Sequence, residues 1–388
     1  MEDLYSRLGA SSTKEEVHAA IQNLDKGIAP GAFCKVLPDI LGGDPQMVNA
    51  MHADGAGTKS ILAYLYWRQT GDISVWRGIA QDALVMNLDD LLCIGARKNL
   101  VVTSTIGRNK RLIPGEVLKE IIESTEAFCQ SIKEYGVNLV FAGGETADVG
   151  DLVQTIIVDS AFTVRFPKKE LIDAANIKPG NVVIGLSSSG KANYETETNS
   201  GIASNGITLA RHSLLSHRYA DEYPEVSDPK LRDAGGYTGK FDLEDKLFQN
   251  HKNLGLGLLS PTRTYAPIIY ELLESLPAGS ITGIIHNTGG GLGKAKKFIT
   301  NAKIEKEVNW EIPEVFQLIQ NQTGITWKEM MQTFNCGLRM EIYCEETVAD
   351  SILKTASEFG VNAYYVGRVV PHVGEQITVR SGDQEWSY

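Results

Sequence analysis

Apolar residues alternate between strand-like and helix-like spacing along the first half of the chain. Short apolar runs bounded by glycine or polar residues predict strands. These runs cover residues 48–51, 100–106, 138–142 and 153–166. Apolar residues spaced by three and four predict helices over residues 61–67, 76–92 and 114–135. Strands that alternate with helices are typical of an α/β fold.

A polar stretch with two prolines, residues 167–179, follows this half and predicts a boundary between two domains, 1–170 and 171–388. In the second half, strands are predicted over residues 182–186, 281–285, 341–344, 363–370 and 376–380. Helices are predicted over residues 204–214, from Pro261 onward, and over residues 347–359. Residues 191–203 are predicted to form an inserted loop, and the polar residues 217–253 a long excursion with little core.

The composition fits a soluble globular protein, since 43% of the 388 residues are apolar. The 37 Lys and Arg residues stand against 48 Asp and Glu residues, which gives a net charge of −11. An acidic surface argues against nonspecific nucleic-acid binding and against a basic membrane-surface role. The five cysteines form no CxxC pair, which argues against a disulfide framework and a zinc site. No apolar stretch approaches the roughly 18–20 residues of a membrane span, and no secretory signal is evident, so we expect a cytoplasmic protein.

The segment Asp54-Gly55-Ala56-Gly57-Thr58-Lys59 concentrates candidate chemistry between a predicted strand and a predicted helix. Glycines let the backbone approach a ligand closely. An acidic side chain at a strand end can hold a divalent metal, and a lysine can meet a phosphate. The segment is not a Walker A loop, because Thr58 and not glycine precedes Lys59. Taken alone, it also fits an ordinary strand-to-helix turn with an extended lysine side chain.

Two further acidic sites lie in the same half of the chain. Asp89 and Asp90 stand at the end of an apolar helical stretch, and side chains of helical neighbours point about 100° apart. One of the two is therefore expected to face the core, and the alternative is that both face solvent. Gly143-Gly144-Glu145-Thr146 is predicted to be an acidic turn after a strand. If the strands share one sheet, these acids and Asp54 would converge on an oxygen-rich Mg²⁺ site.

In the second half, Gly289-Gly290-Gly291 lies between a predicted strand and the basic segment 294–297. A strand, a glycine turn and a helix N-terminus together can hold a phosphate, because free N–H groups and the helix dipole point at the turn. The alternative is a tight turn or a helix cap.

Seven segments occur in a characteristic order: DGAGTK, DDLLCIGA, GGETAD, SSSG followed by SNG, LLSPTRTY, NTGGG and TFNCGLRM. Together they resemble the phosphoribosylformylglycinamidine cyclo-ligases, also called aminoimidazole ribonucleotide synthetases, of purine biosynthesis. The resemblance runs over about residues 30–370. The wider superfamily, which includes selenophosphate synthetase and thiamine-monophosphate kinase, shares only the acidic N-terminal motifs. LLSPTRTY and MMQTFNCGLRM favour the cyclo-ligase branch.

The resemblance implies an α/β (α+β) protein. Its N-terminal domain would bind ATP and metal, and the sheet of that domain would pair across a homodimer into a barrel. Its C-terminal domain would be an α/β sandwich-like unit that completes the substrate site. The implied cofactors are ATP and Mg²⁺, and the implied partner is a small phosphoribosyl substrate. ATP would phosphorylate the formyl amide oxygen of formylglycinamidine ribonucleotide, and the amidine nitrogen would then close the ring.

Residue roles are implied by position in these motifs. The implied catalytic residues are Lys59, Asp90 and Asn335, and the implied metal ligands are Asp54, Asp90 and Glu145. The implied ATP-binding residues are Asp54, Gly55, Gly57, Thr58, Lys59, Gly143, Gly144, Glu145 and Thr146. The implied substrate- or phosphate-binding residues are Ser188, Ser204, Asn205, Gly289, Gly290 and Gly291.

The chain departs from the family pattern at several positions. Ala203 stands where the family has a histidine, so His212, His286 or the insert would have to supply any role of that side chain. Asp89 replaces the usual asparagine. The N-terminal glycine-rich loop is thinned to residues 29–32, of which one is glycine. These departures concern substrate contacts more than the fold.

Two alternative functions stay open at this point. The first is another ATP-dependent kinase or synthetase of the superfamily; selenophosphate synthetase would want a reactive cysteine, and the apolar setting of Cys34 argues against one. The second is a non-catalytic nucleotide-binding paralogue. The thinned loop and Ala203 favour this second hypothesis, whereas the retained residues argue against it: Asp54, Lys59, Asp90 and Glu145.

Overall fold

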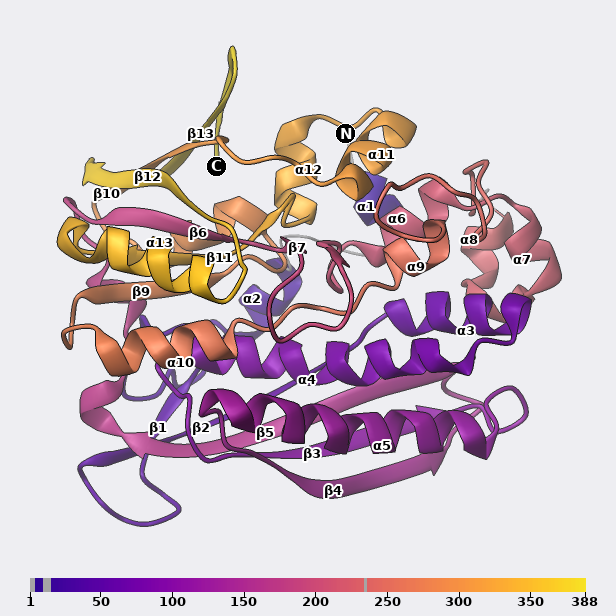
Figure 1. Cartoon of the computed structure of the whole chain (residues 1–388), viewed down its shortest axis with the longest axis horizontal. Coiled ribbons are helices and arrows are strands. Elements are labelled where there is room, and N and C mark those ends of the chain that lie inside the picture. Colours follow the sequence, from indigo (N-terminus) through magenta and orange to yellow (C-terminus); the bar gives the residue numbers. More distant parts are fainter. Residues whose placement is uncertain (1–3, 10–14, 234–235) are drawn as a thin grey trace.

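The computed structural model describes residues 4–9, 15–233 and 236–388, and within them two large sheets form two layers of the molecule (Figure 1). The first sheet is mixed and has the strand order β1-β2-β5-β3-β4. Its strands are β1 (Val36–Pro38), β2 (Met47–Gly55), β3 (Leu100–Arg108), β4 (Leu139–Asp148) and β5 (Ile156–Pro167). The strands predicted for this half are therefore all present.

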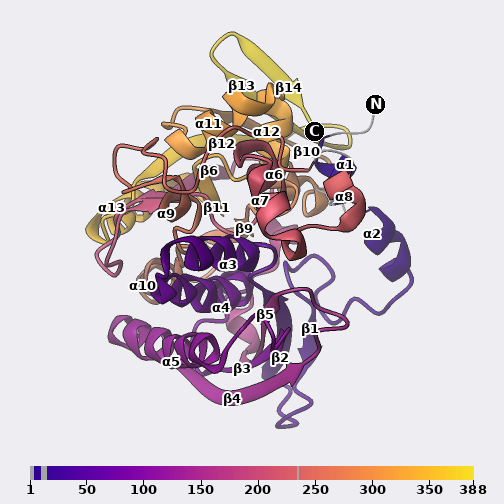
Figure 2. The same ribbon diagram turned by 90° about the vertical axis from the view of Figure 1, so that its right-hand side faces the viewer.

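Three helices cover one face of the first sheet: α3 (Lys59–Thr70), α4 (Trp76–Leu92) and α5 (Gly115–Ser131). The bounds of α4 agree with the prediction. Because α4 lies between the first sheet and the second half of the chain, nearly all of its side chains are buried (Figure 2). Its polar residues therefore face protein partners and not bulk water, which makes α4 the element around which the candidate site is built.

The second sheet has the strand order β14-β13-β10-β12-β6-β11-β9. Its strands are β6 (Val182–Ser187), β9 (Ile281–His286), β10 (Ala302–Glu307), β11 (Leu338–Cys344), β12 (Ala363–Pro371), β13 (Glu375–Ser381) and β14 (Gln384–Ser387). Helix α13 (Ala349–Glu358) packs on β6 and β12 of this sheet (Figure 1), and α10 (Ala266–Ser275) packs against both α13 and α4. Strands and helices in both halves confirm the predicted α/β (α+β) class.

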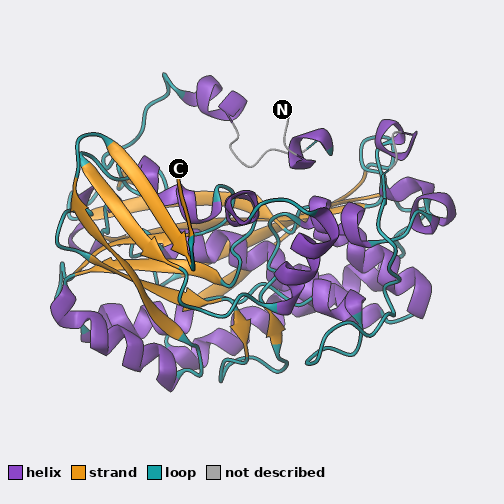
Figure 3. Ribbon diagram, turned by 90° about the horizontal axis from the view of Figure 1, so that it is seen from above, coloured by secondary structure: helices purple, strands orange, loops and turns teal. Residues whose placement is uncertain are grey.

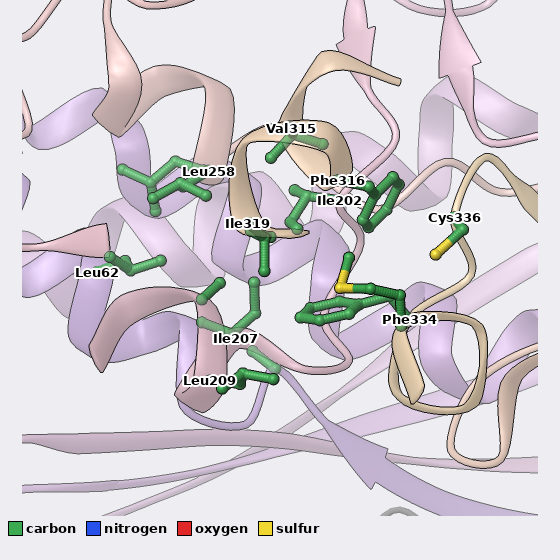
Figure 4. Packing of buried hydrophobic residues seen from close by; sticks show 14 of the residues in the cluster. Leu62, Ile202, Ile207, Leu209, Leu258, Val315, Phe316, Ile319, Phe334 and Cys336 are labelled. Atoms are coloured by element: carbon green, nitrogen blue, oxygen red, sulfur yellow. The ribbon is translucent and has the colours of Figure 1, made fainter. Parts of the chain in front are cut away.

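A third group of helices lies beside the strands, as Figure 3 shows, and it includes α6 (Ile207–Leu214), which is labelled in Figure 1. Helix α11 (Glu314–Thr323) packs against both α6 and α12 (Trp327–Thr333), and α3 packs against both α6 and α9 (Leu254–Leu258). Figure 4 shows Leu62, Ile207 and Phe334 turned into one apolar cluster, although they come from three distant segments. Gly206 begins α6 with φ of 77°, and a Cβ at this position would lie 2.2 Å from the Phe334 ring. Only glycine combines that backbone with so close a contact.

Two predicted local structures are wrong. Gly143 to Thr146 do not form a turn, because β4 runs through them in register with β3. The two glycines instead accompany a register shift opposite Val102 and Ser104, where Gly143 has φ of 84°. Pro261 does not open a helix, since residues 261–265 belong to no helix or strand and α10 begins at Ala266.

Two predicted loops are more ordered than expected. Residues 191–203 include the strand β8 (Asn199–Ser200), which pairs with β7 (Ser189–Gly190) as a small hairpin. The hairpin is fixed to the 259–265 segment by the Arg263–Glu195 ion pair and by the Asn199 side-chain bond to the Pro261 carbonyl. Residues 217–253 contain the helices α7 (Arg218–Glu222) and α8 (Pro229–Asp233) and bury a set of apolar side chains: Tyr219, Ala220, Val226, Tyr237 and Leu243. The prediction of little core was therefore wrong.

The other face of the first sheet exposes alternate side chains of its strands. Met51, Thr163, Val101 and Val140 lie in one row across β2, β5, β3 and β4, so they share a face. Met51 is 61% exposed, and Val101 and Val140 are 41% and 44% exposed. Within the described ranges, every helix is too short or too polar to cross a bilayer.

Candidate active site between the two halves

A cavity of about 440 Å³ brings together predicted site residues from both halves of the chain. Gly57 and Thr58 line it from the end of β2, and Ser204 and Asn205 line it from the turn before α6. The Thr58 and Thr208 hydroxyl oxygens lie 2.9 Å apart, and this contact joins the two walls. Residues far apart in sequence and from two predicted motifs thus share one concave site, as expected of a binding site.

The short N-terminal helix α1 (Leu4–Arg7) contributes a third wall through Tyr5. Burial raises the pKa of the Tyr5 hydroxyl, although a hydrogen bond from the Gly206 backbone opposes the change. This contact places Tyr5 at the start of α6, beside Ser204 and Asn205.

Asp90 lies at the end of α4 and contacts two histidines. His286 Nδ1 is 2.6 Å from Asp90 Oδ1, and His52 Nε2 is 3.3 Å from Asp90 Oδ2. His52 in turn contacts the Asn87 side-chain oxygen at 2.8 Å. Both acids are buried, so the expectation that only one of them faces the core was wrong, and so was the alternative that both face solvent. Asp90 meets this histidine pair, and Asp89 accepts a hydrogen bond from Thr264.

The charge state of this cluster follows from its contacts. Burial alone would raise the pKa of Asp90, but the hydrogen bond from His286 and the charges of His286, Lys294 and His52 lower it to about 2. Burial lowers the pKa of His286 to about 3, and Arg339 adds to the effect. Asp90 is therefore an anion at neutral pH, and His286 is a neutral ring that donates its Nδ1–H to that anion.

The three predicted metal ligands do not meet within one chain. Asp54 pairs with Ser160 on β5, whereas Glu145 pairs with Thr105 on β3 in the next row, so their side chains point to opposite faces of the sheet. Three strand spacings, roughly 14 Å, separate β2 from β4. Asp90 is buried on the helix side of the sheet. Among the described residues, no group of three or more His, Cys, Asp or Glu side chains is placed to hold a metal ion.

Lys59 is not on the open wall of the cavity. Its side chain is fully buried, and its ammonium lies 3.0 Å from Asp82 Oδ1 and 2.6 Å from the Ser260 carbonyl oxygen. Asp82 also accepts hydrogen bonds from the backbone and hydroxyl of Thr262, whose hydroxyl lies 2.9 Å from that of Ser204. Lys59 is thus joined to the cavity wall through two intermediates, and the structure gives it the contacts of a positioning residue.

The predicted glycine loop lies near the Asp90 cluster. Gly290 and Gly291 have positive φ; Gly290 precedes the 3₁₀ helix Gly291–Lys297, and Gly291 is its first residue. Lys294 in this helix donates to the Thr288 hydroxyl at 2.6 Å, and its charge acts on Asp90. The loop and Asp90, which belong to different halves, are therefore neighbours.

Asn335 connects two turns of the second half. Its side-chain oxygen accepts from the Ser188 hydroxyl and the Gly337 backbone, both at 2.8 Å, and its Nδ2 donates to the Gly201 carbonyl at 2.9 Å. Asn335 and Ser188 are both buried. The structure thus brings these two predicted residues together, and their mutual contacts fix the turns that precede α6.

Several residues at the site were not singled out from the sequence. His52 lies two residues before Asp54, and residues two apart in a strand share a face. This spacing could have indicated that His52 lies on the same side of the sheet as Asp54. Asn87 donates to the Asp54 and Ser160 carbonyls and so ties α4 to the sheet. Nothing in the sequence indicated the burial of Asp82, because a single acidic residue in a helix usually lies on the surface.

His212 is the histidine of α6 and lines the cavity, whereas Ala203 is buried with φ of 57°. Burial, with Arg211 adding to it, lowers the pKa of His212 from 6.5 to about 3. In the unfolded chain this ring takes up a proton at a higher pH than in the folded protein. The stability that neutral His212 contributes is therefore complete above about pH 6.5 and is lost as the pH falls toward 3.

We therefore expect His212→Asn to make stability less dependent on pH. Between pH 6 and 4, the wild-type free energy of unfolding should fall by about 1.4 kcal/mol per pH unit more than that of the variant. Urea unfolding at several pH values measures this difference, with His372→Asn at an exposed histidine as the control. Parallel curves for wild type and His212→Asn would show that His212 takes up its proton without unfolding.

Comparison with known proteins places the chain in a family. The family model "AIR synthase related protein, N-terminal domain" matches residues 34–163, and "AIR synthase related protein, C-terminal domain" matches residues 178–380. The chain belongs to the AIR synthase related family. Two relatives in this family are named phosphoribosylformylglycinamidine cyclo-ligase. The Pseudothermotoga lettingae relative is 31% identical over 84% of this chain and 82% of its own, and the Methanocaldococcus jannaschii relative is 28% identical over 82% and 77%.

Solved structures of AIR synthase-like fold are similar at low identity. T. maritima PurL complexed with FGAR aligns with a TM-score of 0.55 at 16% identity, over 97% of this chain and 49% of that one. The same protein complexed with ADP gives a TM-score of 0.55 at 14% identity, over 97% and 47%. A HypE–HypF complex gives 0.54 at 17% identity, over 96% and 97%. These likenesses establish the fold, and the family matches confirm the resemblance found in the sequence.

Proposed function

We propose that this protein catalyses the ATP-dependent ring closure of formylglycinamidine ribonucleotide to aminoimidazole ribonucleotide, in the cytoplasm. The observation that carries the proposal is the match of both family models, which together span residues 34–163 and 178–380. Relatives with the cyclo-ligase name match over most of their own length. The cavity lined by motifs from both halves supports the same conclusion. In this proposal, residues 1–170 bind ATP and metal, and residues 171–388 complete the substrate site.

The proposed reaction asks the protein mainly to position groups. ATP phosphorylates the formyl amide oxygen, which makes that oxygen a leaving group. The amidine nitrogen of the substrate attacks the same carbon, the ring closes and phosphate departs. Orientation of the two reacting groups and compensation of charge supply most of the rate in such reactions. The donors Thr58, Ser204 and Asn205 at the cavity and the anionic Asp90 near the glycine loop are suited to these tasks.

The proposed cofactors are ATP and Mg²⁺. The described residues offer no closed metal site, so we assign the ion no step and expect it to enter with ATP. Mg²⁺ in such enzymes is held by nucleotide phosphates and one or two carboxylates, which fits acids that stand apart. Asp54 is exposed, and it lies three and four residues before Gly57 and Thr58 of the cavity wall.

The test is a direct assay. Purified protein is incubated with ATP, Mg²⁺ and formylglycinamidine ribonucleotide, and ADP and the aminoimidazole product are measured. We expect ADP and product in equal amounts, both dependent on the ribonucleotide. ATP binding without ribonucleotide-dependent turnover would contradict the proposal and favour a non-catalytic nucleotide-binding protein.

We also propose a homodimer, in which a second copy covers the open face of the first sheet. The support is the apolar row formed by Met51, Val101 and Val140, three large side chains more than 40% exposed on one face. Glu145 lies on the same face, so a partner would cover this predicted metal ligand as well.

Val101→Glu is expected to convert the dimer to a monomer, because the substitution places a charge at the centre of this row and charges are disfavoured in buried interface cores. Light scattering during gel filtration measures the mass. Lys119→Glu, at an exposed position of α5, is the control and should stay dimeric. A Val101→Glu protein with unchanged dimer mass would exclude this face as the interface.

A further inference from the structure

Arg211 of α6 is a buried cation on the wall of the cavity. It is 3% exposed, its Nη1 donates to the Val226 carbonyl at 2.8 Å, and the same group contacts the Tyr237 hydroxyl. No carboxylate forms an ion pair with it in the described part of the chain, and its buried Nε has no hydrogen-bond partner there. Burying a charge without a counter-ion is costly. A cation left in this state at the wall of a cavity indicates that an anion belongs in the cavity.

The acidic residue that lines the same cavity does not fill this role. Asp228 accepts the backbone N–H of Lys230 at 2.7 Å and forms no ion pair with Arg211. The neutral aromatic ring of Tyr237 lies 5.2 Å from the Arg211 guanidinium carbon, and a ring of this kind attracts the cation without neutralising its charge.

The start of α6 points toward the same space. Ser204, Asn205, Ile207 and Thr208 line the cavity, and they surround the first turn of this eight-residue helix. The first N–H groups of a helix and the helix dipole favour an anion. Arg211 lies one turn further on, four residues after Ile207, and therefore on the same side of the helix. A buried arginine and the first turn of a helix thus line one cavity.

His212 adds a donor whose orientation is fixed. The Tyr237 backbone N–H donates to His212 Nδ1 at 3.1 Å, and the two rings are in contact at 4.6 Å between centroids. Because Nδ1 accepts, the neutral ring carries its proton on Nε2. Among the described residues, none forms a hydrogen bond with Nε2. The Nε2–H group can therefore donate to a ligand in the cavity that His212 lines.

We propose that this cavity binds the phosphate group of a phosphoribosyl substrate, with Arg211 as its counter-ion and the His212 Nε2–H as a second donor. The identity of the substrate rests on the proposed function, whereas the need for an anion rests on Arg211 alone. A phosphomonoester supplies the charge and the acceptor oxygens that both groups lack. A volume of about 440 Å³ holds a phosphate together with part of a ribose.

The experiment compares ligands with and without the phosphate. Calorimetry measures the Kd of formylglycinamidine ribonucleotide, of the riboside that lacks the phosphate, and of ATP, for wild type and for Arg211→Gln. We expect the ribonucleotide Kd to rise by about 10- to 100-fold in the variant, because one charged hydrogen-bonding group is lost. The riboside and ATP should bind as they do to wild type. The assignment would be overturned if the ribonucleotide Kd did not change in the variant. It would also be overturned if the riboside Kd rose as much as the ribonucleotide Kd, or if only the ATP Kd rose.

A second pair of variants tests the site even if Arg211→Gln fails to fold. His212→Gln keeps an N–H near the position of Nε2, whereas His212→Asn keeps only an acceptor near Nδ1. His212→Asn should weaken ribonucleotide binding by about 3- to 10-fold and His212→Gln should restore it, with the riboside unaffected in both. Equal ribonucleotide affinity in the two variants would overturn the role of Nε2. Arg218→Gln, at a half-exposed arginine of α7, is the charge control.

Turnover separates this inference from the proposed function. If wild type binds the ribonucleotide through Arg211 but forms no product, the phosphate site stands and the cyclo-ligase reaction fails. The opposite result is that wild type forms product while Arg211→Gln still binds the ribonucleotide as much more tightly than the riboside as wild type does. This result would support the cyclo-ligase reaction and contradict the phosphate site at Arg211.

Discussion

Replacing Asp90 by asparagine is expected to lower kcat/KM for ring closure by roughly 10²- to 10³-fold, the size seen when one preorganised charged contact is removed from an active site. Asp90 is an anion that accepts from His286 through one oxygen and contacts His52 through the other. An asparagine side chain has one oxygen and one NH₂ group, so one imidazole would face a donor in place of an acceptor. Both the charge and the geometry of the cluster would be lost.

Steady-state kinetics measures this effect, and Asp39→Asn is the matched control. Asp39 is also a buried aspartate whose pKa is held low, in this case by Arg165, and its contacts lie with β2 and β5 on the side away from the cavity. The control should lose stability but keep kcat/KM within about twofold. An Asp90→Asn protein that is folded and retains wild-type kcat/KM would remove Asp90 from the proposed site.

Sequence periodicity predicted the fold well where one face of an element is buried. The 76–92 helix and most strands of both sheets follow from apolar spacing, whereas β1, β10 and β14 were not predicted. Prediction failed at Gly143 and Gly144 because glycine pairs occur both in turns and at β-bulges, and strand pairing decides between them. It failed for residues 217–253 because their few apolar side chains are spread among charges. They become a core only when α6 and α3 pack against them.

The candidate site was predictable in part. The motifs placed Thr58, Ser204 and Asn205 in one site, and they share one cavity. The burial of Arg211 beside the cavity could not be predicted from the sequence, since an arginine in a helix is normally a surface residue. Its significance lies in the lack of a carboxylate partner in the described structure, which no spacing in the sequence reveals. The predicted metal ligands show a second limit of the sequence. The motifs did not indicate on which face of the first sheet each of the three acids lies, and that face depends on strand pairing.

Lys59→Met is expected to lower the free energy of unfolding by about 3–5 kcal/mol, the cost of leaving one partner of a buried ion pair alone. Lys59 and Asp82 are both fully buried, and methionine would fill the space of the lysine stem but leave the Asp82 charge without its cation. The Lys59 bond to the Ser260 carbonyl would also be lost, so the 259–265 segment would be held less firmly against α4. Urea unfolding at pH 7 measures the change.

The same variant tests whether Lys59 also acts in catalysis, as its place in the DGAGTK motif implies. The double variant Lys59→Met/Asp82→Asn removes both charges and should recover part of the lost stability, because an isolated buried carboxylate is the main cost. Lys119→Met, at a lysine of α5 with a 71% exposed side chain, should change stability by less than about 0.5 kcal/mol. If Lys59 only positions the cavity wall through Asp82 and Thr262, the folded double variant should retain measurable turnover. A double variant that recovers stability but shows no turnover would instead place the Lys59 charge in the reaction.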